Sequence, residues 1–240
     1  MKLKDMFGKK RKPDQPANAP GDPDAKSPAV ERSLAQNEQW LAHTFSRCHD
    51  VRMNKMEFAS PGRTISALLV YCEGLIDEKQ LNESVLPSLR DLFDQEGFSL
   101  QEAYLLTHWS VTPLSTTRRL TDIVDHVFSG YLAVFFDGLN QSFLLDISDP
   151  PQRQPEESRT ELSIAGPRDS FTEDLYMNVA LIRKRLKTNS FRFEQSTIGR
   201  RTKTKVGLLY IDDIIRPEIL QEARDRLAQI DVDSLISSSK

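Results

Sequence analysis

Two stretches of the chain, 139 residues apart, carry the same phrase. Residues 68–81 read LLVYCEGLIDEKQL and residues 207–220 read GLLYIDDIIRPEIL, so that Tyr71 aligns with Tyr210. A third stretch, VFFDGL at residues 134–139, has the same apolar run ending in an acidic turn. Because a repeated phrase marks a repeated structural unit, we expect the fold to contain the same strand-to-turn passage more than once.

The apolar periodicity around each copy predicts a helix, two strands and a second helix. We therefore expect residues 33–90 and 170–229 to superpose as αββα units, with an αββ segment between them. The predicted fold is mixed α/β (α+β), with two small subdomains at residues 31–110 and 111–240, each a mixed sheet flanked by helices. The run AYLLTHW, at residues 103–109, is predicted to be a further strand.

The first 30 residues are rich in Pro, Lys and Asp and lack apolar periodicity, which predicts a disordered arm. Its start is basic, although the net charge of the whole chain is −3. These basic residues are candidates for contact with anionic lipid at a membrane surface: Lys2, Lys4, Lys9, Lys10, Arg11 and Lys12. A solvated surface is the alternative, and the lack of interleaved aromatic residues makes a nucleic-acid partner unlikely.

A second basic region lies between residues 183 and 205, where nine basic residues accompany a single acid, Glu194. Part of it belongs to a predicted helix within GPRDSFTEDLYMNVALIRKRLK, residues 166–187. Ser170 and Glu173 form a predicted capping box at the start of this helix. Its expected apolar face consists of Phe171, Leu175, Val179, Ile182 and Leu186. The helix dipole explains cations in the last turn.

The dipole does not explain Arg200 and Arg201, which lie in a loop between two predicted strands. We therefore expect the GPR helix and the GRRTKT loop to form one basic site whose arginines are partly buried and paired with carboxylates. The arginines are Arg168, Arg183, Arg185, Arg200 and Arg201, and the candidate acids are Asp169, Glu173, Asp174, Asp212 and Asp213. Two separate solvated faces are the alternative.

No catalytic, cofactor or metal site is predicted. The four histidines are scattered without metal-ligand spacing, and GRRTKT lacks the second glycine and the following helix of a phosphate loop. Cys48 and Cys72 suggest no disulfide framework, which favours a reducing compartment. The longest apolar runs, ALLVYC and YLAVFF, are too short to span a bilayer, and the N-terminus lacks the apolar core of a signal peptide.

Several long motifs resemble the A subunit of GerA-type germinant receptors of spore-forming bacteria. They are GPRDSFTEDLYMNVALIRKRL, IGRRTKTKVGLLYIDDI and RLAQIDVDSL, with YCEGLID and FFDGL as shorter signatures. The matching residues are candidates for interaction or structural roles: Gly166, Pro167, Arg168, Phe171, Glu173, Asn178, Arg183, Arg185, Gly199, Arg200, Arg201, Thr202 and Thr204. CHDVR departs from the pattern, because family members usually have small polar residues before the Asp.

The resemblance implies the soluble N-terminal domain of a longer membrane subunit, on the cytoplasmic (spore core) side of the inner spore membrane. It implies that the domain acts together with a transporter-like B subunit, a lipoprotein C subunit and other A subunits, and that it has no enzymatic activity. Two mechanisms stay open. The domain either assembles with neighbouring subunits and passes a conformational change to the membrane part, or binds a small anion or germinant in a cleft between the subdomains.

Overall fold

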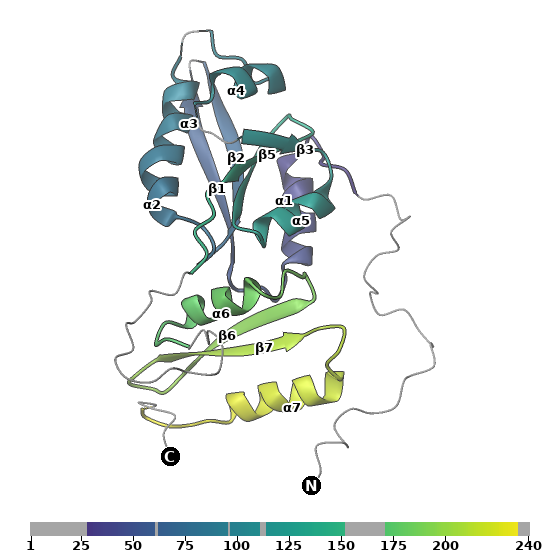
Figure 1. The fold of residues 1–240 in the computed structure, drawn as a ribbon, viewed down its shortest axis with the longest axis vertical. Helices are drawn as coiled ribbons and strands as arrows, with labels where there is room; N and C mark the ends of the chain where they lie inside the picture. Colours follow the sequence, from purple (N-terminus) through teal and green to yellow (C-terminus); the bar gives the residue numbers. More distant parts are fainter. Residues whose placement is uncertain (1–27, 61, 96, 111–113, 152–170, 235–240) are drawn as a thin grey trace, which may run out of the picture.

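The computed structural model describes residues 28–60, 62–95, 97–110, 114–151 and 171–234. These residues form two stacked units, a larger one at residues 28–151 and a smaller one at residues 171–234 (Figure 1). Most of the predicted basic arm, from Lys2 to Lys12 and beyond, lies outside the described residues, as do Gly166, Pro167 and Arg168.

The first unit is built on a five-stranded sheet with the strand order β1-β2-β4-β5-β3. The strands are β1 (Val51–Ser60), β2 (Arg63–Cys72), β3 (Leu114–Thr117), β4 (Tyr131–Phe136) and β5 (Ser142–Asp146). The boundary expected between residues 110 and 111 falls inside this sheet, since β4 pairs with β2 through Ala67–Val70. The two sheets of the described residues are instead divided between β5 and the helix that begins at Leu175.

Both sheets pair their strands in an antiparallel manner, where sequence reasoning expected mixed pairing. Short turns connect β1 to β2 and β4 to β5, and such hairpins impose antiparallel pairing. Among the described residues, parallel pairing occurs only at an isolated bridge between Cys48 and Phe193. That bridge joins the first unit to the second.

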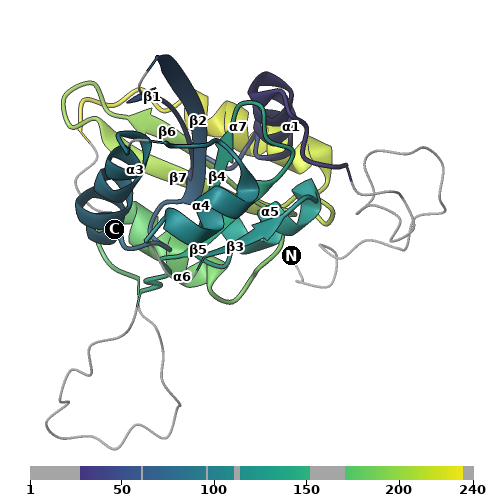
Figure 2. The same cartoon turned by 90° about the horizontal axis from the view of Figure 1, so that it is seen from above.

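Helices cover both faces of the five-stranded sheet. They are α1 (Leu34–Thr44), α2 (Glu78–Gln80) with the π-helical turn η2 (Leu81–Val85), α3 (Leu86–Phe93), α4 (Glu102–His108) and α5 (Leu120–Val127). One core packs under η2, α3 and α4 and another under α1 and α5, and the view from above shows α3 and α1 on opposite sides of the strands (Figure 2). The strand predicted at AYLLTHW is wrong. Leu105 and Trp109, four residues apart, are both buried on one side of α4 and its end, which is helical spacing.

The second unit is a two-stranded sheet between two helices (Figure 1). It runs α6 (Leu175–Arg183), β6 (Phe191–Ile198), β7 (Thr204–Ile211) and α7 (Pro217–Ala228). Its small core consists of Val179, Phe191 and Phe193, with half-buried apolar neighbours on α6 and β7. Pro217 occupies the first turn of α7, where its missing N–H costs no helical hydrogen bond.

The order αββα occurs in both units, as the repeated phrase predicted, and the mixed α/β fold class is confirmed. Specific contacts repeat as well. The amide of Asn37 both accepts from and donates to the backbone of Glu31, and the amide of Asn178 does the same with Thr172. Across the hairpins, Arg52 lies opposite Tyr71 and Arg192 opposite Tyr210. Each arginine also forms an ion pair with the acid two residues after that tyrosine, Arg52 with Glu73 and Arg192 with Asp212.

Candidate functional site

Helix α6 joins the two units because it has two apolar faces. Val179 belongs to the core of the second unit, whereas Ala180 belongs to the core of the first. The close approach is made at Gly74, where a Cβ atom would lie 3.1 Å from the Cβ of Ala180. Gly74 also has a φ of +80°, which few other residues adopt without strain. The glycine of the YCEGLID phrase therefore allows α6 to pack on the turn after β2.

A buried ion pair lies at the centre of this contact. Arg183, in the last turn of α6, donates from Nε to Oδ2 of Asp50 at 2.5 Å and from Nη2 to Oδ1 at 3.0 Å. The side chains are 0% and 1% exposed. The two residues are 133 positions apart in the sequence and belong to different units. This bidentate geometry is the strongest form of a charged hydrogen bond between side chains.

Two aromatic rings enclose the guanidinium of Arg183. Its Cζ lies 3.9 Å from the ring centre of Phe128, at the end of α5, and 4.8 Å from that of Phe191, at the start of β6. Nη1 also donates to the backbone oxygen of Phe191 at 3.3 Å. Burial alone would lower the pKa of Arg183, but the hydrogen bonds and charge of Asp50 raise it. The arginine is therefore a permanent cation, held between rings from both units.

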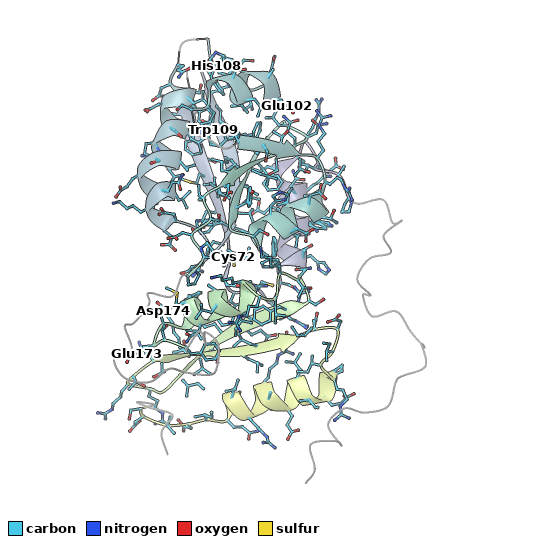
Figure 3. The ribbon with its side chains drawn as sticks, viewed as in Figure 1. Cys72, Glu102, His108, Trp109, Glu173 and Asp174 are labelled. Carbon is cyan, nitrogen blue, oxygen red and sulfur yellow. The ribbon has the colours of Figure 1, made fainter. Side chains whose placement is uncertain are left out.

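Two cysteines complete this cluster, which we call the junction: Cys48, Asp50, Cys72, Phe128, Arg183 and Phe191. Figure 3 shows Cys72 where the first unit meets α6. The thiol of Cys72 donates to Oδ2 of Asp50 at 3.4 Å, and that of Cys48 lies 3.9 Å from the backbone oxygen of Phe191. Burial raises the pKa of Cys48, and burial together with the Asp50 charge raises that of Cys72 further. Both thiols are protonated and unreactive at neutral pH.

The raised thiol pKa values predict a loss of stability in alkali. The folded chain keeps the two thiol protons to a higher pH than the unfolded chain, whose thiols titrate at about pH 8.5. Because the folded state then binds more protons, the free energy of unfolding falls as the pH rises above that value. Urea unfolding between neutral pH and pH ~10 measures the slope, and the Cys72→Ala variant should have a shallower slope than the wild type. Equal slopes would contradict this assignment.

A cleft of about 620 Å³ opens beside the junction, between the two units. Its first-unit wall runs from Phe45 to Arg52, and its second-unit wall is made by Tyr176 and Gln195. Arg52 is engaged by Glu73 through Nε at 2.6 Å and by the Tyr176 hydroxyl through Nη2 at 3.3 Å. The cleft is large enough for a small polar ligand. Its cation Arg52 is, however, already bonded to Glu73 and Tyr176.

A second polar network holds α7 on the hairpin. Arg224 forms two hydrogen bonds to Glu194, one of them from Nε to Oε2 at 2.9 Å, and the Tyr210 hydroxyl donates to Oε1 of Glu194 at 2.5 Å. The hydrogen bonds from Arg224 lower the pKa of Glu194, while burial and this carboxylate raise the pKa of Tyr210 to about 12. These groups fix α7 in place, and two of them, Glu194 and Arg224, line a second cavity of about 470 Å³.

The predicted single basic site does not form. Arg183 lies where β6 begins, whereas Arg200 and Arg201 lie in the turn at its far end, eight residues of strand away. Eight residues of strand span about 26 Å. Of the expected buried and paired arginines, Arg168 lies outside the described residues, and Arg183 alone of the other four is buried. Arg200 is exposed and pairs with Asp231, while Arg185 and Arg201 are exposed.

The remaining motif residues have local roles. The cap of α6 is Asp174, which accepts from the backbone of Met177 at 3.0 Å, so the helix begins later than the predicted capping box. Glu173 is exposed beside Asp174 at the start of α6, and Phe171 is 69% exposed rather than part of the apolar face (Figure 3). Gly199 has a φ of +91° at the hairpin turn, and Thr204 bonds to Thr202 there.

Sequence reasoning missed the partners of Arg183. In the sequence, Asp50 stands out only within CHDVR, and nothing relates Phe128 to Arg183. The repeat does not point to them, because Asp50 corresponds to Ser190 in the second unit: each of these residues accepts a backbone bond from the acid after the second strand. The sequence offset of 139 aligns Asp50 with Asn189, so the repeat held no signal that could have identified Asp50.

Among residues 28–151 and 171–234 with their short gaps, no three His, Cys, Asp or Glu side chains are placed to hold a metal ion. In the same described parts of the chain, no helix has the length and apolar character needed to cross a bilayer.

Comparison with known proteins identifies relatives over most of the chain. Residues 39–240 match the family described as Bacillus/Clostridium GerA spore germination protein. Spore germination protein XA of Bacillus anthracis is 34% identical over 214 residues, which is 88% of this chain and 43% of that protein. Stage V sporulation protein AF of Bacillus subtilis is 30% identical over 217 residues, 88% of this chain and 42% of that protein. The chain thus spans about two fifths of the length of these relatives.

A solved structure has the same fold. It is the crystal structure of the N-terminal domain of the A subunit of the Bacillus megaterium spore germinant receptor GerK3, with a TM-score of 0.68 and 24% sequence identity. The match covers 87% of this chain and 76% of that chain. The stacking of two α/β units is therefore shared with an experimentally determined domain.

Proposed function

The chain belongs to the Bacillus/Clostridium GerA spore germination protein family, and from that premise we propose that it is the N-terminal domain of a germinant-receptor A subunit that assembles the receptor and transmits its signal. The observation that supports this role is the junction. One helix and one buried ion pair connect two units that each have their own core. Such a contact makes the position of one unit depend on the other.

The chemistry of the junction favours a transition between discrete states. A bidentate pair excluded from water is either formed or broken, because a separated buried charge must be solvated. The two rings that enclose Arg183 come from different units, so rotation of one unit against the other would release the guanidinium. Rigid-body rotation about an interface is a common way in which proteins switch.

The proposal includes the setting inferred from the family resemblance. The domain lies on the spore-core side of the inner spore membrane, couples to a membrane channel or transporter complex, acts with B and C subunits and neighbouring A subunits, and performs no catalysis itself. The basic arm from Lys2 to Lys12, which lies outside the described residues, stays a candidate for contact with anionic lipid.

Germination of spores that carry full-length variants tests the proposal. Asp50→Ala or Arg183→Ala should reduce the response to a mixture of amino acids and sugars at least several-fold, with receptor abundance followed by immunoblot. Arg200→Ala is the matched control, because it removes a bidentate pair with Asp231 in which each side chain is 68% exposed. A full response from Arg183→Ala at normal abundance would contradict the proposed role.

The second candidate function is a ligand-binding module, favoured by the cleft beside the junction. Its walls come from both units, so a ligand there would also bias their relative position. Calorimetric titration of the chain with amino acids and sugars tests this, with Tyr176→Ala as the variant that removes one wall. Binding that is lost in Tyr176→Ala would support this candidate, and the absence of any binding would leave the assembly role.

A further inference from the structure

Strand β7 has a free edge in the part of the chain that the structure describes. The two-stranded sheet has the order β6-β7, so only one side of β7 is paired. From Lys205 to Ile211, no backbone N–H donates outside the pairing with β6 in the described residues. Unpaired backbone groups along a strand edge are a template for another strand.

The internal repeat indicates that this edge is an incomplete sheet. The first-unit equivalent of β7 is β2, and the outer edge of β2 is covered by β4 over Ala67–Val70. The backbone oxygen of Ser66, also on that edge, accepts from Asp137. At the offset of 139, Ala67–Val70 correspond to residues 206–209 of β7. The first unit therefore supplies from its own chain a strand that the described second unit lacks.

The edge of β7 is also unprotected by charge. The other long free edge belongs to β1, which has five exposed residues out of ten and carries Arg52, Lys55 and Glu57. Charged side chains of this kind discourage pairing between edges. β7 reads TKVGLLYI, with Lys205 as its one charged residue, and six of its eight residues are only half-buried. Residue by residue, β7 is suited to accept a strand and β1 is not.

Charges at the two ends of β7 fit a second copy of the same strand. The turn before β7 is basic, with exposed Arg201 and Lys203, and the turn after it is acidic, with exposed Asp212 and Asp213. In an antiparallel pair, the start of each strand lies beside the end of the other. Two β7 strands related by a two-fold axis therefore place the basic turn of each copy beside the acidic turn of the other.

We propose that β7 pairs antiparallel with β7 of a second copy of this chain, with the two-fold axis close to Leu208, and so completes a four-stranded sheet. This inference rests on the assembly role proposed above and gives it a contact surface. Helix α6 packs on the apolar side chains of the existing strands, and α7 contacts Glu194 on β6 through Arg224, so both helices contact side chains of the sheet. Lys203 of the GRRTKT motif then lies at the subunit interface, beside Asp213 of the second copy, whereas Arg200 keeps its pair with Asp231 of its own chain.

Sedimentation velocity of the chain over a roughly hundredfold range of concentration tests the pairing by mass action. The wild type should shift from monomer to dimer. Lys205→Pro should stay monomeric, because the alternation of the ladder directs the backbone N–H of Lys205 to the free edge. Lys205→Ala is the matched control and should dimerise, because it retains that N–H. Lys55→Pro makes the same change on the β1 edge and should also dimerise.

A charge exchange tests the orientation without altering the strand. Lys203→Asp and Asp213→Lys should each weaken dimerisation about tenfold, and the double variant should restore it. Lys203 has a φ of +48°, a conformation that Asp tolerates. A wild type that stays monomeric, or a dimer that is unaffected by Lys205→Pro, Lys203→Asp and Asp213→Lys, overturns the proposal and assigns the edge to another receptor subunit or to none. The germination response of the Arg183→Ala variant decides the assembly role separately.

Discussion

Arg183→Ala is expected to lower the free energy of unfolding by about 3–5 kcal/mol, because it leaves the Asp50 carboxylate buried without its counter-ion. The lost cation also removes a contact with the rings of Phe128 and Phe191. The Asp50 side chain is 1% exposed, so its carboxylate has little access to bulk water. Urea unfolding followed by far-UV circular dichroism measures the change, and Asp50→Ala should have a similar effect.

The Arg200–Asp231 pair is a close control for this prediction. It has the same bidentate geometry, from Nε to Oδ1 and from Nη2 to Oδ2, but each side chain is 68% exposed. Arg200→Ala should therefore cost less than about 1 kcal/mol. The double variant Asp50→Leu with Arg183→Met should recover much of the lost stability, because apolar side chains often replace a buried pair without penalty. Equal losses from Arg183→Ala and Arg200→Ala would refute the distinction.

The double variant also separates stability from signalling. If the junction only held the units together, restored stability would restore the germination response. A signalling junction needs a contact that can open, and an apolar contact does not gain the solvation that a released guanidinium gains. We therefore expect the double variant to be stable but weak in response.

The repeat was the part of the fold that the sequence could predict. A phrase around Tyr71 and Tyr210 implies equivalent strands, and the structure adds equivalent ion pairs and equivalent Asn37 and Asn178 contacts. These features are local, since each depends on residues within one unit. Periodicity and caps carry information over such distances.

Pairing between distant segments could not be predicted in the same way. β4 pairs with β2 although the paired residues are more than sixty positions apart in the sequence. This pairing places β4 in the first unit, so the division between the units lies later in the chain than expected. Asp50 meets Arg183 across 133 residues. A single sequence contains no measure of which acid faces which base, so the basic stretch suggested one site where the structure has a buried junction and an exposed turn.

Substitution of Gly130 is expected to cause the second large loss of stability, because this position combines a backbone requirement with a close contact. Its φ is +92°, and a Cβ atom there would lie 2.7 Å from the backbone oxygen of Leu75 and 2.7 Å from the Cβ of Ser148. Gly138 has the same φ but nothing within 4 Å of its Cβ position. Gly138→Ala should cost about 1–2 kcal/mol from backbone strain alone. Gly130→Ala should cost about 2–5 kcal/mol, since displacement of packed neighbours is added.

The displaced neighbour of Gly130 links this prediction to the junction. Leu75 follows Gly74, on which Ala180 of α6 packs. A shift of the turn that contains Gly74 and Leu75 therefore moves the surface on which α6 packs. Cys72 lies at the start of the same turn and is fully buried. Gly130→Ala should therefore expose Cys72 to a thiol reagent at a faster rate than Gly138→Ala does, under conditions where both variants remain folded. Equal labelling rates would mean that the turn accommodates the added methyl group without moving α6. Gly130 would then not be coupled to the junction.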